Sequence, residues 1–216
     1  MTVLGVAKLK VGAIRDHAAA ALRQALLEGR FQPGESLSEV AIASEFDVSR
    51  GPIREAMFVL VAEGLLSHTL NRGFSVLNFS AEDLEQIEVV RIPLESLALS
   101  QAREKMTAES ISRLKEIKSQ LSTFYGAADR EGSLRSEIEF HSSIWEMSGN
   151  AWLVASLKRI MIPSFTYGTA FRMNRPDLTP EIMDQLHGLY TDYLERRSPH
   201  TAEQCVRLHV GLPANP

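Results

Sequence analysis

The stretch that decides the fold is Val48-Ser49-Arg50-Gly51-Pro52-Ile53-Arg54-Glu55-Ala56. Arg50 and Arg54 are four residues apart, so on a helix their side chains share one face, while Ile53 belongs to the opposite, apolar face. Ser49 is a residue type that caps helices, and Pro52 is tolerated because N–H groups in a first turn have no intrahelical partner. The pattern predicts a helix suited to a DNA groove. A solvated amphipathic helix in any small bundle is the alternative.

The segments around this helix complete a winged helix-turn-helix order. The sequence predicts helices at 11–29 and 38–46, then the helix that begins at Ser49 and ends at Gly64, and strands at 65–69 and 73–77. In the short helix we expect Val40, Ala43 and Phe46 to point inward. A composition shift follows at 78–80.

After that shift the chain shows helical patterns without an alternating strand signal. Helices are expected at roughly 81–91, 93–105, 107–127, 131–147, 150–172, 179–197 and 199–210. The predicted fold is therefore mostly α: a winged helix-turn-helix DNA-binding domain at 1–78, followed by an all-α helical bundle at 79–216 for effector binding and dimerisation.

Composition limits the class of protein and its location. The 216 residues are 44% hydrophobic and 23% charged, which is ordinary for a globular protein. The first residues lack a signal-peptide pattern, no apolar run is long enough to cross a bilayer, and the single Cys205 fits a reducing compartment. We therefore expect a cytoplasmic protein that does not engage the membrane. The net charge of -4 means that a DNA-binding surface needs its positive charge sorted onto one face.

Six residues are predicted to bind DNA, from the helix and from the hairpin tip. An arginine at a helix N-terminus can address phosphate together with backbone N–H groups, or can contact guanine with two parallel hydrogen bonds. Glycine exposes backbone where a side chain would block close approach, and the hairpin tip can reach a neighbouring groove. The predicted residues are Ser49, Arg50, Gly51, Arg54, Arg72 and Gly73.

Three histidines and a carboxylate form a second group. Glu137 and His141 are four apart and project from one helix face, and His187 and His209 lie at or near the apolar stripes of their helices. A buried imidazole without a partner is costly, so convergence of the four would make a divalent-metal site. The alternative is a set of unrelated histidines that are hydrogen-bonded or half exposed.

Residues 11–77 resemble the DNA-binding domain of the GntR family of bacterial transcriptional regulators. The matching pieces are Leu27-Glu28-Gly29, Pro33-Gly34-Glu35, Leu37-Ser38-Glu39, Val48-Ser49-Arg50, Pro52-Ile53-Arg54-Glu55-Ala56, Leu60, Glu63-Gly64-Leu65 and Asn71-Arg72-Gly73-Phe74. The resemblance implies that Arg50 and Arg54 contact DNA from a recognition helix and that Gly73 enters the minor groove. The chain departs from the family at Gly51, where a small hydroxyl residue is usual, and at Val40, where some members carry a basic residue.

Residues 80–210 resemble the all-helical FCD effector domain of the FadR-type branch of that family. The matching features are Val90-Arg91-Ile92-Pro93-Leu94-Glu95, Glu137-Ile138-Glu139-Phe140-His141, His187, and Ser198-Pro199 through Ala202 to His209. The resemblance implies a divalent metal at Glu137, His141, His187 and His209, with Glu137 where the family has aspartate. Zinc is the first choice of metal, with nickel, manganese and iron as alternatives.

The resulting expectation is a homodimeric, ligand-responsive regulator, a repressor, that binds a palindromic double-stranded operator. A small carboxylate effector would bind the metal and an arginine, with Arg91, Arg172 and Arg175 as candidates; surface or ion-pair roles are their alternative. A metalloenzyme that uses the Glu/His site is the rival, but the set lacks a general base of the kind found in HExxH helices. A regulator whose metal is purely structural or absent is a third possibility. Because a regulator is the leading hypothesis, we expect no catalytic residues.

Overall fold

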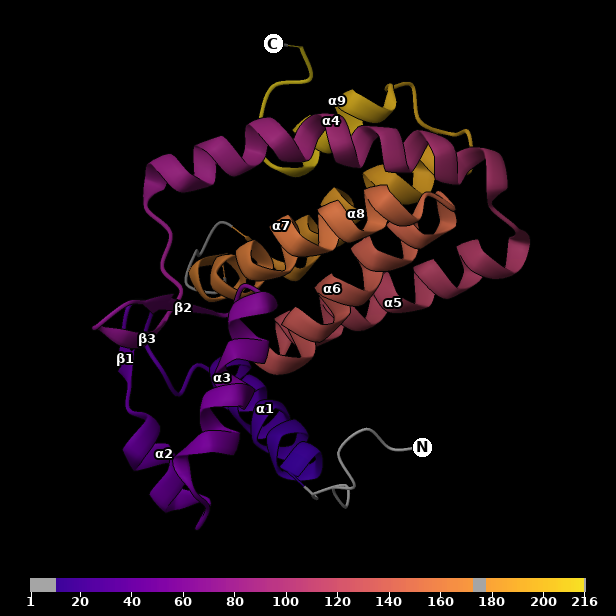
Figure 1. Ribbon diagram of the computed structural model, residues 1–216. Coiled ribbons are helices and arrows are strands. Elements are labelled where there is room, and N and C mark those ends of the chain that lie inside the picture. The colour runs from indigo at the N-terminus through magenta and orange to yellow at the C-terminus, as the bar shows by residue number, and fades with distance from the viewer. Residues whose placement is uncertain (1–10, 173–177, 216) are drawn as a thin grey trace, which may run out of the picture. The chain divides into compact units, whose positions relative to one another are not determined.

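The computed structural model describes residues 11–172 and 178–215, without the side chains of residues 11, 12, 27, 81 and 167–172. The chain divides into two compact units, Met1–Asn78 and Phe79–Pro216, and each is treated by itself (Figure 1).

The first unit contains three helices and a small sheet among its described residues. Its elements are α1 (Val11–Leu27), β1 (Ser36–Leu37), α2 (Glu39–Glu45), α3 (Arg50–Ala62), β2 (Leu66–Thr69) and β3 (Gly73–Val76). The sheet is antiparallel in the order β1-β3-β2. Phe74 of the central strand β3 lies opposite Leu37 of β1 and opposite His68 of β2. The predicted winged helix-turn-helix order is confirmed. Strand β1 was not predicted, because two residues are too few to show an alternating pattern.

Helix α3 is the central element of this unit, and it packs against α1, α2 and β2. Its inner face is formed by Ile53, Met57 and Leu60, which are fully buried. The expectation for α2 was wrong at Val40, which is 58% exposed, because Ile42 and Ala43 fill the inner side of this two-turn helix instead. Ser38 caps α2 as expected, since its side chain accepts a hydrogen bond from the N–H of Ala41.

The turn between β2 and β3 has the backbone geometry of a tight wing tip. Asn71 and Gly73 have φ angles of 66° and 81°, in the left-handed region that favours asparagine and glycine. The N–H of Arg72 donates to the carbonyl of Thr69 at 3.0 Å and closes the turn. The side chain of Arg72 is exposed.

The second unit is a bundle of helices. Its described helices are α4 (Ala81–Lys105), α5 (Ala108–Gly126), α6 (Arg130–Met147), α7 (Ala151–Arg172), α8 (Pro180–Leu194) and α9 (Ala202–His209). Helix α5 packs against α6 and α8, while α4 packs against α6, α7, α8 and α9 (Figure 1). The core includes Leu99, Leu114, Ile144, Leu194 and Val206. The predicted all-α bundle is confirmed.

Helix α4 corrects the prediction of two helices that meet at Pro93. One continuous helix runs from Ala81 to Lys105 with Pro93 inside it. Proline removes one i→i−4 hydrogen bond, but the helix continues because its inner face is anchored by buried residues on both sides of Pro93, including Arg91 and Leu99. Packing therefore overrides the local signal for a break.

The last two helices begin or end inside the predicted ranges because of their caps. Helix α9 starts at Ala202, where Thr201 and Gln204 form a reciprocal capping box, rather than near residue 199. Helix α8 ends at Leu194, followed by Arg196 at a φ of 60°. Among the helices of the described residues, none combines the length and the apolarity that a membrane span requires.

Candidate nucleic-acid interface and metal centre

The outer face of α3 carries the two predicted arginines. The side chains of Arg50 and Arg54 are 64% and 51% exposed, on the side of the helix opposite its buried residues. Both guanidinium groups contact the carboxylate of Glu39 on α2, at 3.4 Å and 3.7 Å. Arg54 also lies against the ring of Phe58, at 5.8 Å from its centroid. The arginines thus share one acidic partner and leave most of their surface in solvent.

Two predicted residues at the start of α3 have open surroundings. Ser49 is the N-cap residue, as expected, but its side chain makes no capping hydrogen bond. Gly51 is exposed, and a Cβ built on it would meet no atom of the described structure within 4 Å. The backbone and the small side chains at the start of α3 can therefore come close to an extended polyanion such as a phosphate backbone. In the wing, a Cβ on Gly73 would also meet no described atom within 4 Å, but its positive φ favours glycine.

Glu39 is the residue of this surface that sequence reasoning missed. It is the first residue of α2, and its side chain is only 14% exposed. The sequence has Glu39 on one helix and two arginines on the next. Their contact can be inferred only when the geometry of the turn between the two helices is known. One negative charge between two positive ones restrains the arginine rotamers and lowers the local positive potential.

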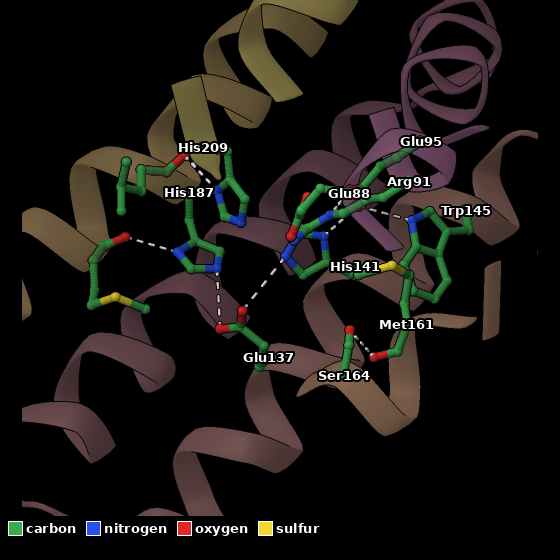
Figure 2. A network of polar contacts seen from close by, with 12 residues as sticks. Glu88, Arg91, Glu95, Glu137, His141, Trp145, Met161, Ser164, His187 and His209 are labelled. Carbon is green, nitrogen blue, oxygen red and sulfur yellow. Dashed lines mark hydrogen bonds and ion pairs between the residues drawn. The ribbon is translucent and has the colours of Figure 1, made fainter. Parts of the chain in front are cut away.

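The four predicted metal ligands meet inside the bundle. One ligand atom from each of Glu137, His141, His187 and His209 lies within 4.8 Å of the others. The Glu137 carboxylate is 3.3 Å from Nε2 of His187 and 3.8 Å from Nε2 of His141 (Figure 2). The ring centroids of His187 and His209 are 4.8 Å apart. Helices α6, α8 and α9 bring together residues up to 72 positions apart, which no helical spacing could establish (137 to 209).

Each imidazole is oriented by a partner at its outer nitrogen. Nδ1 of His187 lies 2.8 Å from the carbonyl of Met183, Nδ1 of His209 lies 3.2 Å from the carbonyl of Leu186, and Nδ1 of His141 lies 2.6 Å from Glu95. Carbonyls only accept, so Nδ1 donates in the first two. Nε2 of His141 and of His187 is buried and has no hydrogen-bond partner among the described residues. Both Nε2 atoms face the Glu137 carboxylate, on the side where a metal ion would bind.

Burial sets the charge state of this cluster. It lowers the pKa of His141 despite the opposing effect of Glu95. It also lowers the pKa of His209 well below the ordinary value, and the neighbouring His187 and His141 add to that shift. Both imidazoles therefore stay neutral at neutral pH, which is the form that binds a metal.

Beside the cluster lies a buried ion pair on α4. Nε of Arg91 donates to Glu95 at 2.7 Å, and the two side chains are 5% and 1% exposed. Burial alone would raise the pKa of Glu95, but Arg91 and His141 outweigh it and hold that pKa well below its usual range. Burial and the nearby Glu95 raise the pKa of Tyr190 well above its usual value. Arg91 is thus a buried ion-pair residue next to the histidines.

Other residues of the second unit differ in exposure. Trp145, Phe165 and Cys205 are buried, whereas Trp152 is 84% exposed. Arg172 ends α7 and Arg175 follows it; the side chain of the first and the whole of the second lie outside the described residues, and so does the side chain of Tyr167.

The donor set fits a divalent metal. Three imidazoles and a carboxylate suit zinc, nickel, manganese or iron. Atoms about 2.1 Å from one ion are at most about 4.2 Å apart, so ligand atoms spread over 4.8 Å need to close by roughly half an ångström. The unpartnered Nε2 atoms and the oriented rings supply what such an ion requires.

Comparisons with known proteins agree with both halves of the fold. The family model "Bacterial regulatory proteins, gntR family" matches residues 14–76, and the model "FCD domain" matches residues 86–212. The uncharacterized HTH-type transcriptional regulator YdhC of Bacillus subtilis is 32% identical over 140 residues, which are 64% of this chain and 62% of YdhC. The matched part of this chain thus spans less than two thirds of that relative.

Two further relatives extend over more of the chain. The HTH-type transcriptional repressor GlaR of Escherichia coli is 25% identical over 204 residues, which are 89% of this chain and 90% of GlaR. The solved structure of E. coli McbR/YncC superposes with a TM-score of 0.72 at 20% identity, covering 92% of this chain and 93% of that one. That structure supports the fold alone. The chain belongs to the gntR family of bacterial regulatory proteins, within the group whose members carry an FCD domain.

Proposed function

We propose that this chain is a ligand-responsive, sequence-specific DNA-binding transcriptional regulator that acts as a repressor in the cytoplasm. Residues 1–78 would bind DNA, and residues 79–216 would bind the effector and dimerise. The observation that carries the proposal is the two-sided helix α3, whose inner residues are fully buried while Arg50 and Arg54 are exposed on its outer face. The repressor role is supported by GlaR, a relative described as a repressor.

In this proposal α3 is the recognition helix and lies in the major groove of an operator. Arg50 and Arg54 would contact phosphates or guanine edges, while Ser49 and Gly51 allow the start of the helix to approach the backbone closely. Arg72 and Gly73 would bring the wing into the adjacent minor groove. Phosphate contacts of this kind make affinity strongly dependent on salt.

The proposed sensor is the cluster in the bundle. Glu137, His141, His187 and His209 would hold the divalent ion, with zinc as the first choice. When bound, the ion supplies a Lewis acid that can accept a carboxylate oxygen of a small effector. Nη2 of Arg91 is buried without a hydrogen-bond partner among the described residues, so it can donate to such a carboxylate. We retain Arg172 as a second effector-binding candidate.

We propose that the partner subunit is a second copy of this chain, packed on the outer face of α4. Val89, Val90 and Leu97 on this helix are 72%, 43% and 46% exposed, although all three are apolar. The first turn of α4 is acidic and its last turn is basic, so two copies packed antiparallel about the middle of α4 would pair opposite charges at both ends. A two-fold dimer would match a palindromic operator.

The test of the DNA-binding proposal is in vitro selection from a library of duplexes with randomised centres, at fixed salt. The wild-type chain should enrich an inverted repeat, because two identical recognition helices contact two half-sites. Enrichment should be lost in Arg50→Ala/Arg54→Ala. A wild-type protein that enriches no sequence over several rounds would refute the proposal.

A further inference from the structure

Glu95 is a buried carboxylate on α4 that contacts three donors at once. Oε1 accepts from Nε1 of Trp145 at 3.1 Å and lies 2.6 Å from Nδ1 of His141. Oε2 accepts from Nε of Arg91 at 2.7 Å. The side chain is 1% exposed. No sequence pattern singled out this residue for a function, because its partners lie on α4 and α6 and are 4 to 50 positions away.

Burying this carboxylate is expensive unless its partners are well placed. An ionised group removed from water loses its hydration, which paired charges and hydrogen bonds must offset. Replacing both members of a buried ion pair with well-packed apolar residues is often neutral or stabilising, so stability alone does not explain the pair. The arrangement therefore points to a role in orienting its neighbours, one of which, His141, belongs to the histidine cluster (Figure 2).

The bond to His141 fixes one metal ligand. Because the ionised carboxylate can only accept, Nδ1 of His141 must donate the proton. Nε2 is then unprotonated and lies 3.8 Å from Glu137, on the side where an ion would bind. Carboxylate partners of this kind set the tautomer of a ligating histidine and raise its basicity.

The bond to Arg91 fixes the candidate effector residue. With Nε donating to Glu95 and Nη1 at 3.5 Å from Glu88, the guanidinium plane is held against Phe165, whose ring centroid is 5.5 Å away. Nη2 remains as the buried nitrogen without a hydrogen-bond partner in the described structure. One carboxylate thus orients a metal ligand through one oxygen and an anion-binding candidate through the other.

We infer that Glu95 is the positioning residue that couples the metal site to Arg91, so that disturbing either side of its carboxylate changes the affinity for the ion. This inference rests on the proposed metal site. The inference can be tested at Arg91, which among the described residues forms hydrogen bonds or ion pairs with Glu95 and Glu88 and with none of the four proposed ligands. Loss of a positive charge near a cation would strengthen metal binding, whereas loss of a positioning contact would weaken it.

The experiment is a titration of the metal-free, full-length chain with Co²⁺. The visible absorption of the bound ion measures how much Co²⁺ is bound. The variants are Glu95→Gln, Arg91→Gln, the double variant, and Glu104→Gln as the control. Glu104 is also on α4, but its side chain is 64% exposed and pairs with Arg196. Circular dichroism of each variant checks that it is folded.

Glu95→Gln should weaken Co²⁺ binding about 10- to 100-fold and change the absorption spectrum, because His141 loses its fixed orientation. Arg91→Gln should weaken it roughly 3- to 10-fold, and the double variant should match Glu95→Gln within about twofold. Glu104→Gln should stay within about twofold of wild type. Tighter binding by Arg91→Gln, or unchanged binding by Glu95→Gln, would overturn the inference while leaving the metal site intact.

Co²⁺ binding by the wild-type chain distinguishes a failure of this inference from a failure of the proposed metal site. If the wild-type chain binds no Co²⁺, the metal site itself fails, and the coupling fails with it. If Glu95→Gln does not fold, ¹⁵N NMR of the wild-type histidines gives the same answer. His141 should carry its proton on Nδ1, and a proton on Nε2 instead would contradict the role of Glu95.

Discussion

At the scale of single residues, Gly51 is the position where the proposed DNA-binding surface of α3 has room for a side chain. Its surroundings are open, since a Cβ there meets no described atom within 4 Å. It is flanked by Arg50 and lies one turn before Arg54, so a hydroxyl at this position would face the DNA backbone that we propose these arginines contact.

Gly51→Ser should therefore strengthen operator binding. One added hydrogen bond to a phosphate is worth about 0.5–1.5 kcal/mol, or about 2- to 10-fold in affinity. Fluorescence anisotropy with the selected duplex at fixed salt measures the change. Gly51→Ala is the matched control, because it alters helix propensity without adding a hydroxyl. Equal affinities for the serine and alanine variants would argue against a backbone contact at this point.

The proposed metal ligands give a second residue-scale prediction. Wild-type protein loaded with zinc and then desalted should retain about one ion per chain, and His187→Ala should lose it, because Nε2 of His187 faces Glu137 at 3.3 Å. Elemental analysis of the purified proteins measures the content. His200→Ala, in the same unit but outside the cluster, should retain the ion. Equal metal content in His187→Ala and wild type would refute the ligand set.

The residues show where sequence reasoning succeeds and where it stops. Glu137 and His141 share a face because of their spacing, and His187 and His209 lie at or near the apolar stripes of their helices, but only the family resemblance implied that the four residues converge. The partners that orient them, Glu95 for His141 and Glu39 for the arginines, follow from tertiary packing, so the local pattern does not reveal them.

At the scale of elements, α4 shows how packing overrides a local signal. A proline inside a helical pattern predicted a break, yet α4 runs through Pro93 with buried residues on both sides. Periodicity identified the helices of the bundle, but it could not decide whether two helical segments join. The same limit explains Val40, whose exposure was decided by how a two-turn helix rotates onto α3.

Pro93→Ala should stabilise the protein. Alanine is about 3 kcal/mol better than proline in a helix interior, and Pro93 is exposed, so a gain of roughly 1–3 kcal/mol in the free energy of unfolding is expected. Urea unfolding measures it. Pro163 also lies inside a helix but is buried, so Pro163→Ala should gain less because it removes packed atoms. A loss of stability in Pro93→Ala would show that α4 requires the proline.

At the scale of the whole molecule, the two units carry separate chemistry on one chain. The first presents exposed arginines, and the second buries titratable groups around a proposed ion. An effector can change DNA binding only if its affinity differs between the DNA-competent and incompetent states. We expect α4 to differ between these two states, because it begins directly after the first unit in the sequence and contains Arg91 and Glu95.

Val89→Asp should weaken dimerisation by at least about tenfold, because it places a desolvated charge in the proposed α4 interface. Sedimentation equilibrium measures the dissociation constant. Since Val89 is 72% exposed within one chain, the fold of the protomer should be unaffected. Leu212→Asp, at another exposed leucine of the same unit, is the control. A dimer as stable as the wild type in Val89→Asp would place the interface elsewhere.

The most direct test of the account is the affinity of Arg54→Ala for the selected duplex, measured by fluorescence anisotropy at fixed salt beside Arg30→Ala. Arg30 is an equally charged residue of the same unit, 69% exposed and paired with Glu28, outside α3. We predict that Arg54→Ala binds at least about tenfold more weakly than wild type, and that Arg30→Ala stays within about twofold. Wild-type affinity in Arg54→Ala would contradict the assignment of α3 as the recognition helix.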